Sequence, residues 1–384
     1  MKPFEVIAIS EVSGDITSDE VSKYRRNIGL GQLKFDFDYN QFIMSSQPRV
    51  SVLMPCYNAA ATLEEALDSL AGQTLTDFEL VVVDDGSTDA TPRLLEGRAR
   101  WDARMRIVTS AHQGIVRSLN KGLQHCRTAL VARMDADDRC HPQRLERQVS
   151  YLEAQADVAV VGSLVSAFPS ENVRQGLILY LEWQNSLLDD ASMRREMFVE
   201  SPLAHPSVTL RRDWLERAGG YQEHGWAEDY DLWLRLYLAG ARFAKLPEVL
   251  LEWREGPERL TRRDSRYSLE NFLRLKAHYL RQGPCAGREI VFIWGAGMIG
   301  RRLSRHLLGQ GIPLAAFIDI DPRKIGNTRQ GLPILPPEEL PGWKRRVPGL
   351  VVLAAVGARG ARSLIRQRLV AQGWIEGQDW WCVA

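Results

Sequence analysis

The sequence lacks several features that would assign it to a specialised class of protein. It has no apolar run of about 18 residues, so no segment is long enough to span a membrane. Its first residues lack the apolar core of a secretion signal. Its five cysteines are scattered and never spaced as CxxC, which argues against a disulfide framework or a zinc site. These absences indicate a cytoplasmic protein in a reducing compartment.

Neither sign of charge is in excess. The chain has 49 Lys and Arg against 48 Asp and Glu, a net charge of +1, so we expect no nucleic-acid partner bound through bulk charge. Its 384 residues predict more than one domain. We expect an N-terminal extension over 1–48, a first domain over 49–283 and a second over 284–384, with the breaker pair Gly283 and Pro284 at the last boundary.

Apolar strands alternate with helical patterns through the first domain. Runs at 50–54, 78–83 and 130–134 are rich in β-branched residues and predict buried strands. Continuous apolar strands separated by helices are typical of an α/β fold with a mostly parallel sheet covered on both faces. Ligands of such a sheet bind at the carboxyl ends of its strands.

Carboxylates follow two of these strands directly. Asp84 and Asp85 follow 78–83, where a carboxylate can accept a hydrogen bond from a nucleotide base, although the same residues are typical of a plain turn. Asp135 and Asp137 follow 130–134 at positions i and i+2. They can converge on Mg²⁺ or Mn²⁺, or can lie at the start of the next helix without a ligand.

A third acidic pair lies near the end of the first domain. Glu228 and Asp229 come just before an amphipathic helix. A carboxylate there can act as a general base or can simply cap the helix. Each of the three acidic motifs is weak evidence when taken alone.

Taken in order, the motifs resemble the signature of family 2 glycosyltransferases, which have the GT-A fold. The segments that carry the resemblance are VLMPCYN at 52–58, VDDGSTD at 83–89, MDADD at 134–138 and ED at 228–229. Two further segments fit, QTLTDFE at 73–79 and NKG at 120–122. The resemblance covers about residues 49–260.

The resemblance implies a role for each matching position on the donor side. Pro55 and Tyr57 would line the nucleotide pocket, and Asp85 would bind the uracil ring. Asp135 would hold the ribose or sugar, and Asp137 would be the main ligand of the metal ion on the diphosphate.

On the acceptor side the resemblance implies that Asp229 is the catalytic base of an inverting reaction, with Glu228 beside it in the substrate site. The chain departs from the family pattern after the last strand, where many relatives carry Arg-x-His and this chain has Arg254 without a histidine. Arg254 and the arginines that follow it can bind the diphosphate, lie on a solvated helix face, or meet anionic lipid.

The second domain begins with a strand followed by a glycine motif. Gly295, Gly297 and Gly300 form GxGxxG, and Asp319 comes 19 residues later at the end of the next apolar run. This is the context of a dinucleotide-binding fingerprint. The unit also resembles small Rossmann-like domains that accompany other sugar-modifying enzymes. It either binds a nucleotide or NAD(P), or is retained as a scaffold.

These observations predict a metal-assisted inverting glycosyltransferase. The donor is expected to be a nucleotide-sugar, most simply a UDP-sugar, and the acceptor a hydroxyl of a glycan or lipid-linked precursor, so the enzyme would work at the inner face of the membrane by peripheral association. Two alternatives stay open: a bifunctional protein with an NAD(P)-dependent second domain, and a catalytically dead nucleotide-sugar binding protein.

Overall fold

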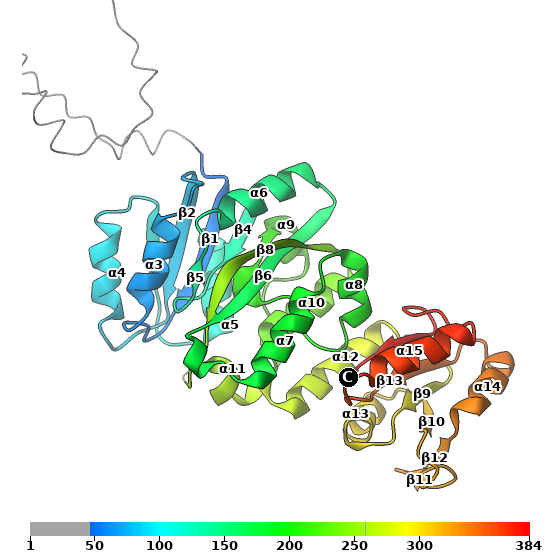
Figure 1. Ribbon diagram of the computed structural model, residues 1–384. Coiled ribbons are helices and arrows are strands. Elements are labelled where there is room, and N and C mark those ends of the chain that lie inside the picture. Colours follow the sequence, from blue (N-terminus) through cyan, green and yellow to red (C-terminus); the bar gives the residue numbers. More distant parts are fainter. Residues whose placement is uncertain (1–46, 258) are drawn as a thin grey trace, which may run out of the picture. The chain divides into compact units, whose positions relative to one another are not determined.

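The computed structural model describes residues 47–257 and 259–384 (Figure 1). Almost all of the predicted N-terminal extension lies outside the described residues. The described chain forms two sheets with helices packed against them, which confirms the expected α/β class.

The first sheet has eight strands in the order β3-β2-β1-β4-β7-β6-β8-β5. Its strands are β1 (Val50–Cys56), β2 (Phe78–Asp84), β3 (Met105–Thr109), β4 (Leu130–Arg133), β5 (Arg139–Cys140), β6 (Val158–Phe168), β7 (Thr209–Arg211) and β8 (Arg242–Arg254). Strands β3, β2, β1 and β4 are parallel, and β7 runs antiparallel to both β4 and β6.

Helices connect these strands and cover the sheet. They are α3 (Leu63–Ala71), α4 (Thr91–Ala99), α5 (Ile115–His125), α6 (Arg144–Ala154), α7 (Gln175–Asn185), α8 (Asp190–Glu196), α9 (Arg212–Arg217), α10 (Glu228–Leu238), α11 (Leu260–Arg263) and α12 (Leu269–Gln282). Short 3-10 helices lie at η1 (Ser170–Asn172), η2 (His205–Ser207), η3 (Ser265–Tyr267) and, in the C-terminal part, η4 (Pro337–Glu339).

Strand β2 shows why the central strands form. All of its residues are buried, and successive side chains contact opposite faces of the sheet. Val81 and Val83 belong to one hydrophobic cluster, and Leu80 and Val82 belong to the other. A continuous apolar run is required because helices cover both faces.

The second sheet has six strands in the order β11-β12-β10-β9-β13-β14. They are β9 (Val291–Trp294), β10 (Leu314–Ile318), β11 (Thr328–Arg329), β12 (Leu332–Leu335), β13 (Val351–Ala354) and β14 (Trp380–Cys382), with helices α13 (Met298–Gly309), α14 (Leu340–Arg346) and α15 (Ala361–Ala371). All pairings are parallel except the short hairpin between β11 and β12.

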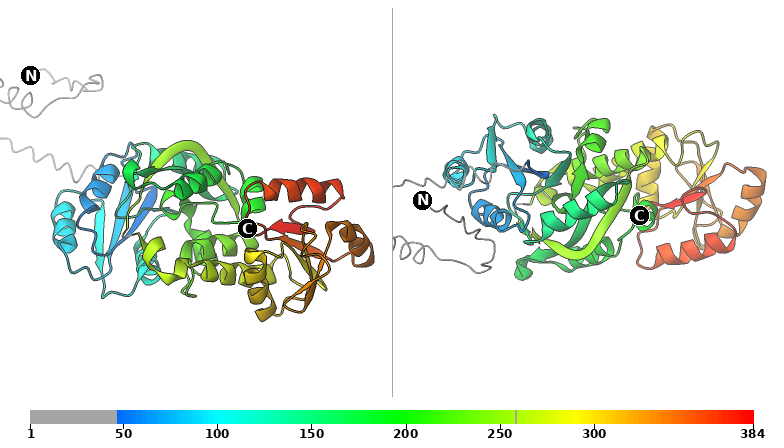
Figure 2. Two further views of the ribbon diagram at one scale, coloured as in Figure 1. Left: turned by 60° about the horizontal axis from the view of Figure 1, so that its bottom comes forward. Right: turned by 90° about the horizontal axis from the view of Figure 1, so that it is seen from above.

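The two sheets share one continuous hydrophobic core. A single cluster of buried side chains includes Leu273 and Leu280 of α12 together with Leu303 and Leu307 of α13. Helices α12 and α13 pack against each other (Figure 2). The buried Lys276 of α12 also links the two sheets. Its Nζ donates to the carbonyl oxygen of Val199, which follows α8, at 2.6 Å, and to that of Val383, which follows β14, at 3.2 Å. None of the helices in the described residues is long and apolar enough to cross a membrane.

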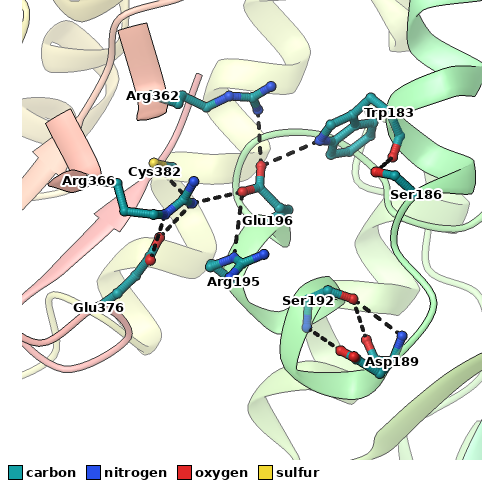
Figure 3. Close-up of polar contacts among 10 residues, drawn as sticks. All are labelled: Trp183, Ser186, Asp189, Ser192, Arg195, Glu196, Arg362, Arg366, Glu376 and Cys382. Atoms are coloured by element: carbon teal, nitrogen blue, oxygen red, sulfur yellow. Dashed lines mark hydrogen bonds and ion pairs between the residues drawn. The ribbon is translucent and has the colours of Figure 1, made fainter. Parts of the chain in front are cut away.

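An ionic cluster adds a second connection between the two sheets (Figure 3). Glu196, at the end of α8, is buried and accepts hydrogen bonds from Arg366 at 2.8 Å and from Arg362 at 3.1 Å, both on α15. Trp183 donates to the same carboxylate, and Arg366 also binds Glu376. Removing the Glu196 charge would leave two arginines without their main acidic partner on the first sheet.

We therefore expect Glu196→Gln, which keeps the side-chain volume, to lower the free energy of unfolding by about 2 kcal/mol. This loss is smaller than the loss expected on breaking a fully buried ion pair, because both arginines are partly exposed. Urea unfolding monitored by circular dichroism measures this. Glu338→Gln is the control, because its exposed pair with Arg368 should contribute about 0.5 kcal/mol or less. Equal effects of the two substitutions would contradict a structural role for Glu196.

Candidate active site

The carboxyl ends of the parallel strands β1, β2 and β4 meet at one edge of the first sheet. Cys56 at the end of β1 pairs with Asp84 at the end of β2. The loops beyond them are joined by the Asn58 side chain, which accepts a hydrogen bond from the Thr88 backbone N–H at 2.8 Å. The first two sequence motifs therefore form one rigid rim.

Asp85 lies in this rim with its carboxylate held by the loop after β3. Its two oxygens accept the backbone N–H groups of Gln113 at 2.9 Å and Gly114 at 2.8 Å. His112 lies 2.8 Å from the same carboxylate, and its ring stacks on Tyr57 with centroids 4.0 Å apart. Tyr57 is exposed, so the stacked pair presents a flat aromatic surface beside a fixed acceptor.

Pro55 is placed differently from the other predicted pocket residue in its motif. It is buried within β1, paired with Val83 of β2. Its contribution at this edge is therefore to the shape of the strand end, while Tyr57 supplies the exposed surface.

Three carboxylates gather in the loop after β4. Ligand atoms of Asp135, Asp137 and Asp138 all lie within 4.8 Å of one another. Asp138 is buried, and its Oδ2 has no hydrogen-bond partner among the described residues, while its Oδ1 accepts the Arg254 N–H at 2.8 Å. Hard oxygen ligands with one unsatisfied buried oxygen fit a divalent cation such as Mg²⁺ or Mn²⁺.

The pKa values reflect this crowding. Burial and, to a smaller extent, Asp135 raise the pKa of Asp137 to about 6 against the lowering effects of Arg259 and Arg133. Burial and the two neighbouring carboxylates also raise the pKa of Asp138. Like charges this close need a cation to ionise together.

Two arginines form hydrogen bonds with the backbone at the end of β4 and in the loop that follows it. The buried Arg144 of α6 donates to the carbonyl oxygen of Arg133 at 2.6 Å. Arg254 donates to the carbonyl oxygen of Asp137 at 2.6 Å and forms an ion pair with Glu65. The Arg254 guanidinium is thus committed to protein partners. Arg259, whose charge acts on Asp137 together with that of Arg133, is itself paired with the buried Glu255 at 2.8 Å.

Glu228 and Asp229 form the first turn of α10. Glu228 is buried and accepts a hydrogen bond from the Tyr267 hydroxyl at 2.8 Å. Asp229 is partly exposed. Burial and the neighbouring Glu228 raise the pKa of Asp229 to about 7, while the Tyr230 N–H and Arg133 lower it.

Arg133, at the end of β4, connects the two acidic groups. It is 2% exposed and forms an ion pair with Asp135. Its positive charge lowers the pKa of Asp137 and of Asp229 against the effect of burial on each. The charge of one guanidinium therefore acts on carboxylates of both the third and the fourth sequence motif, although almost a hundred residues separate them in sequence.

Sequence reasoning missed several residues at this edge. Arg133 is a charged residue at the end of an otherwise apolar strand, and this exception to the pattern indicates a functional position. His112 lies in a loop and Tyr267 in a short 3-10 helix, where no periodicity marks them, whereas Arg259 is one of the arginines expected from the sequence to bind the diphosphate. The predicted glycines Gly295, Gly297 and Gly300, with Asp319, are not part of this cluster, because they lie at the carboxyl edge of the second sheet.

Comparison with known proteins identifies relatives of this arrangement. The sequence profile described as "Glycosyl transferase family 2" matches residues 51–219. The chain is 35% identical over 218 residues to the amylovoran biosynthesis glycosyltransferase AmsE of Erwinia amylovora, covering 56% of this chain and 79% of that protein. It is 33% identical over 294 residues to EpsE of Bacillus subtilis, whose name also describes a glycosyltransferase, covering 75% and 99%.

A third relative has a more specific name. Over 248 residues the chain is 28% identical to the UDP-Gal:alpha-D-GlcNAc-diphosphoundecaprenol beta-1,3-galactosyltransferase of Escherichia coli, covering 64% of this chain and 88% of that protein.

The raised pKa of Asp229 makes its effect on stability dependent on pH. An unfolded Asp has a pKa near 4, so ionisation of Asp229 destabilises the folded state increasingly as pH rises from there to about 7. We expect Asp229→Asn to stabilise the protein by about 2 kcal/mol more at pH 8 than at pH 5.

Chemical unfolding of both proteins at the two pH values measures this difference. Asp213→Asn is the control, because its carboxylate is exposed and paired on the surface with Arg217. A stabilisation by Asp229→Asn that is the same at pH 5 and pH 8 would show that burial of the charge is not the cause.

Proposed function

The chain belongs to glycosyltransferase family 2, and from this premise we propose that it is an inverting enzyme that moves a sugar from a UDP-sugar to a hydroxyl of a glycan or lipid-linked acceptor with the help of a divalent cation. The observation that carries this proposal is the cluster of the Asp135, Asp137 and Asp138 carboxylates, together with Arg133, which pairs with Asp135 and acts electrostatically on both Asp137 and Asp229. The reaction needs acids for two separate tasks in one cleft, and this edge of the sheet supplies both.

On the donor side, the proposed uracil site is the rim formed by Asp85 and the stacked Tyr57 and His112. An aromatic face and a fixed carboxylate suit a flat ring that carries an N–H. The Asp85 oxygens already accept two backbone N–H groups and also lie near the His112 ring and the Ser110 hydroxyl, so a base N–H would take the place of one of these two side-chain contacts. Asp135 is proposed for the ribose or sugar hydroxyls.

Asp137 and its neighbours in the triplet would hold the Mg²⁺ or Mn²⁺ ion. When bound, the ion would neutralise the charge that develops on the departing diphosphate. Arg259, one of the arginines predicted for the diphosphate, acts on Asp137 and would be a second source of positive charge if its pair with Glu255 opens toward the substrate. Arg254, also predicted for this task, would act indirectly by fixing the loop.

On the acceptor side, Asp229 would take the proton from the acceptor hydroxyl. The hydroxyl oxygen would then attack the anomeric carbon from the face opposite the diphosphate, which leaves. A base works best when its pKa lies near the working pH, and burial raises the pKa of Asp229 to about 7. Glu228, held by Tyr267, would sustain that raised pKa and fix the start of α10.

The names of the relatives support the choice of substrates. The Escherichia coli relative is named for a UDP-Gal donor and a diphosphoundecaprenol-linked acceptor, and the Erwinia amylovora relative for polysaccharide biosynthesis. We propose the same classes here: a UDP-sugar donor and a glycan or lipid-linked acceptor. A lipid-linked acceptor would bring the enzyme to the membrane surface.

We expect Asp229→Asn to reduce sugar transfer by about 10²–10⁴-fold, because the proton acceptor is lost, while binding of the UDP-sugar stays close to that of the parent. Transfer assays and calorimetric titration with UDP-sugars measure the two properties separately. Asp213→Asn should change neither. Transfer at the parental rate by the Asp229→Asn enzyme would overturn the assignment of the base.

We expect Asp137→Ala to abolish the dependence of donor turnover on Mn²⁺, with a loss of activity of about 10²-fold or more, since the diphosphate charge is no longer neutralised. The measurement is UDP-sugar hydrolysis as a function of Mn²⁺ concentration. An unchanged Mn²⁺ dependence in this variant would exclude Asp137 as a ligand.

A further inference from the structure

A cavity of about 930 Å³ opens at the carboxyl edge of the second sheet, in a part of the chain that the proposed transfer reaction does not use. It is formed by the ends of β9, β10 and β13 and by one face of α15. Three large apolar side chains around it are strongly exposed: Met298 at 58%, Ile320 at 69% and Leu364 at 68%. Apolar side chains that line a cavity and face solvent are typical of a ligand site.

The topology of the sheet places this cavity where ligands bind in related architectures. In chain order, the parallel strands run outward from β9 in two directions, through β10 to β12 on one side and through β13 to β14 on the other. The point where the order reverses lies between β9 and β13, and crevices at this point bind ligands in open α/β sheets. Residues at the ends of both strands line the cavity.

The three glycines of the loop after β9 differ in what they do. A Cβ on Gly300 would lie 1.8 Å from the Gly295 carbonyl oxygen, and Gly295 itself has a φ of +119°. Both are therefore required by the fold. A Cβ on Gly297 would meet nothing within 4 Å, and its φ of −80° suits any residue, so the fold alone does not require a glycine there.

The absence of a side chain at Gly297 leaves the first backbone N–H groups of α13 accessible from the cavity. The first N–H groups of a helix have no partner within the helix, and together with the helix dipole they favour an anion. Lys324 and Arg368 also line the cavity. Lys324 is paired with Asp319 and Arg368 with Glu338, and Asp319 and Asp321 line the cavity as well, so the positive potential available to an anion comes from the start of α13.

Asp319 has a structural role in this loop. Its carboxylate accepts the Ala296 N–H at 2.9 Å, the Asp321 N–H at 3.0 Å and the Lys324 ammonium at 3.0 Å. These contacts fix the backbone of the glycine loop. They occupy three of about four acceptor positions, so Asp319 has less capacity for a ribose hydroxyl than a free carboxylate would have.

We propose that this cavity binds a nucleoside diphosphate, free or as part of a nucleotide-sugar, with the diphosphate at the start of α13 and the base against Ile320 and Leu364. The site is separate from the donor site, because it belongs to the second sheet and shares no residue with the rim around Asp85. Titration with nucleotides of different bases identifies which base the cavity accepts.

The test uses the full chain and two glycine variants of α13. Isothermal titration with ADP and with UDP is performed on the parent, on Gly297→Val and on Gly309→Val. Gly309 lies at the other end of the same helix and also has open space around it, so it is the matched control.

We expect Gly297→Val to weaken one binding event by about tenfold or more, since the side chain occupies the place of the diphosphate. Its melting temperature and its sugar-transfer rate should match those of Gly309→Val. Loss of an ADP-binding event would identify an adenine nucleotide, and loss of a second UDP-binding event would identify a uridine nucleotide or UDP-sugar.

A second variant, Leu364→Asp, places a charge where the base would lie and should weaken the same event, because the residue is exposed and its change leaves the core intact. Identical titrations for the parent, Gly297→Val and Leu364→Asp would overturn the proposal. So would the absence of any event, up to about 1 mM of either nucleotide, beyond the one at the donor site.

Discussion

One buried guanidinium, that of Arg133, determines how the acids of the first sheet can coexist. It forms an ion pair with Asp135 in the loop after β4, and its charge also acts on Asp137 and on Asp229 at the start of α10. Burial raises the pKa values of Asp137 and Asp229 despite this cation. These acids therefore ionise together only if further positive charge is present, which the proposed divalent cation would supply.

The geometry that brings these acids together is that of parallel strands, and the chain uses it twice. In the first sheet the ends of β1, β2 and β4 bring three motifs to one edge. In the second sheet the ends of β9, β10 and β13 surround a cavity. In both cases a carboxylate at the end of a buried strand, Asp85 after β2 and Asp319 after β10, accepts two backbone N–H groups and so fixes the backbone of the neighbouring loops.

Much of this arrangement could be predicted from the sequence, because apolar strands followed by acids are local patterns. The predicted strand at 50–54 is β1, and that at 78–83 is β2, each slightly longer in the structure. What could not be predicted depends on contacts between distant segments. The direction of the Arg254 side chain follows from Glu65 and the Asp137 carbonyl, more than a hundred residues away.

The buried contacts between α12 and α13 cross the predicted domain boundary near Pro284. The two sheets are topologically separate, yet the apolar face of α12 is covered by side chains that follow the boundary in sequence. A fragment that stopped there would leave that face bare to water, at a cost of about 25 cal/mol for each Å² uncovered. The stability of the transferase part therefore depends on contacts with the C-terminal part, and we expect the two parts to unfold together in one cooperative transition.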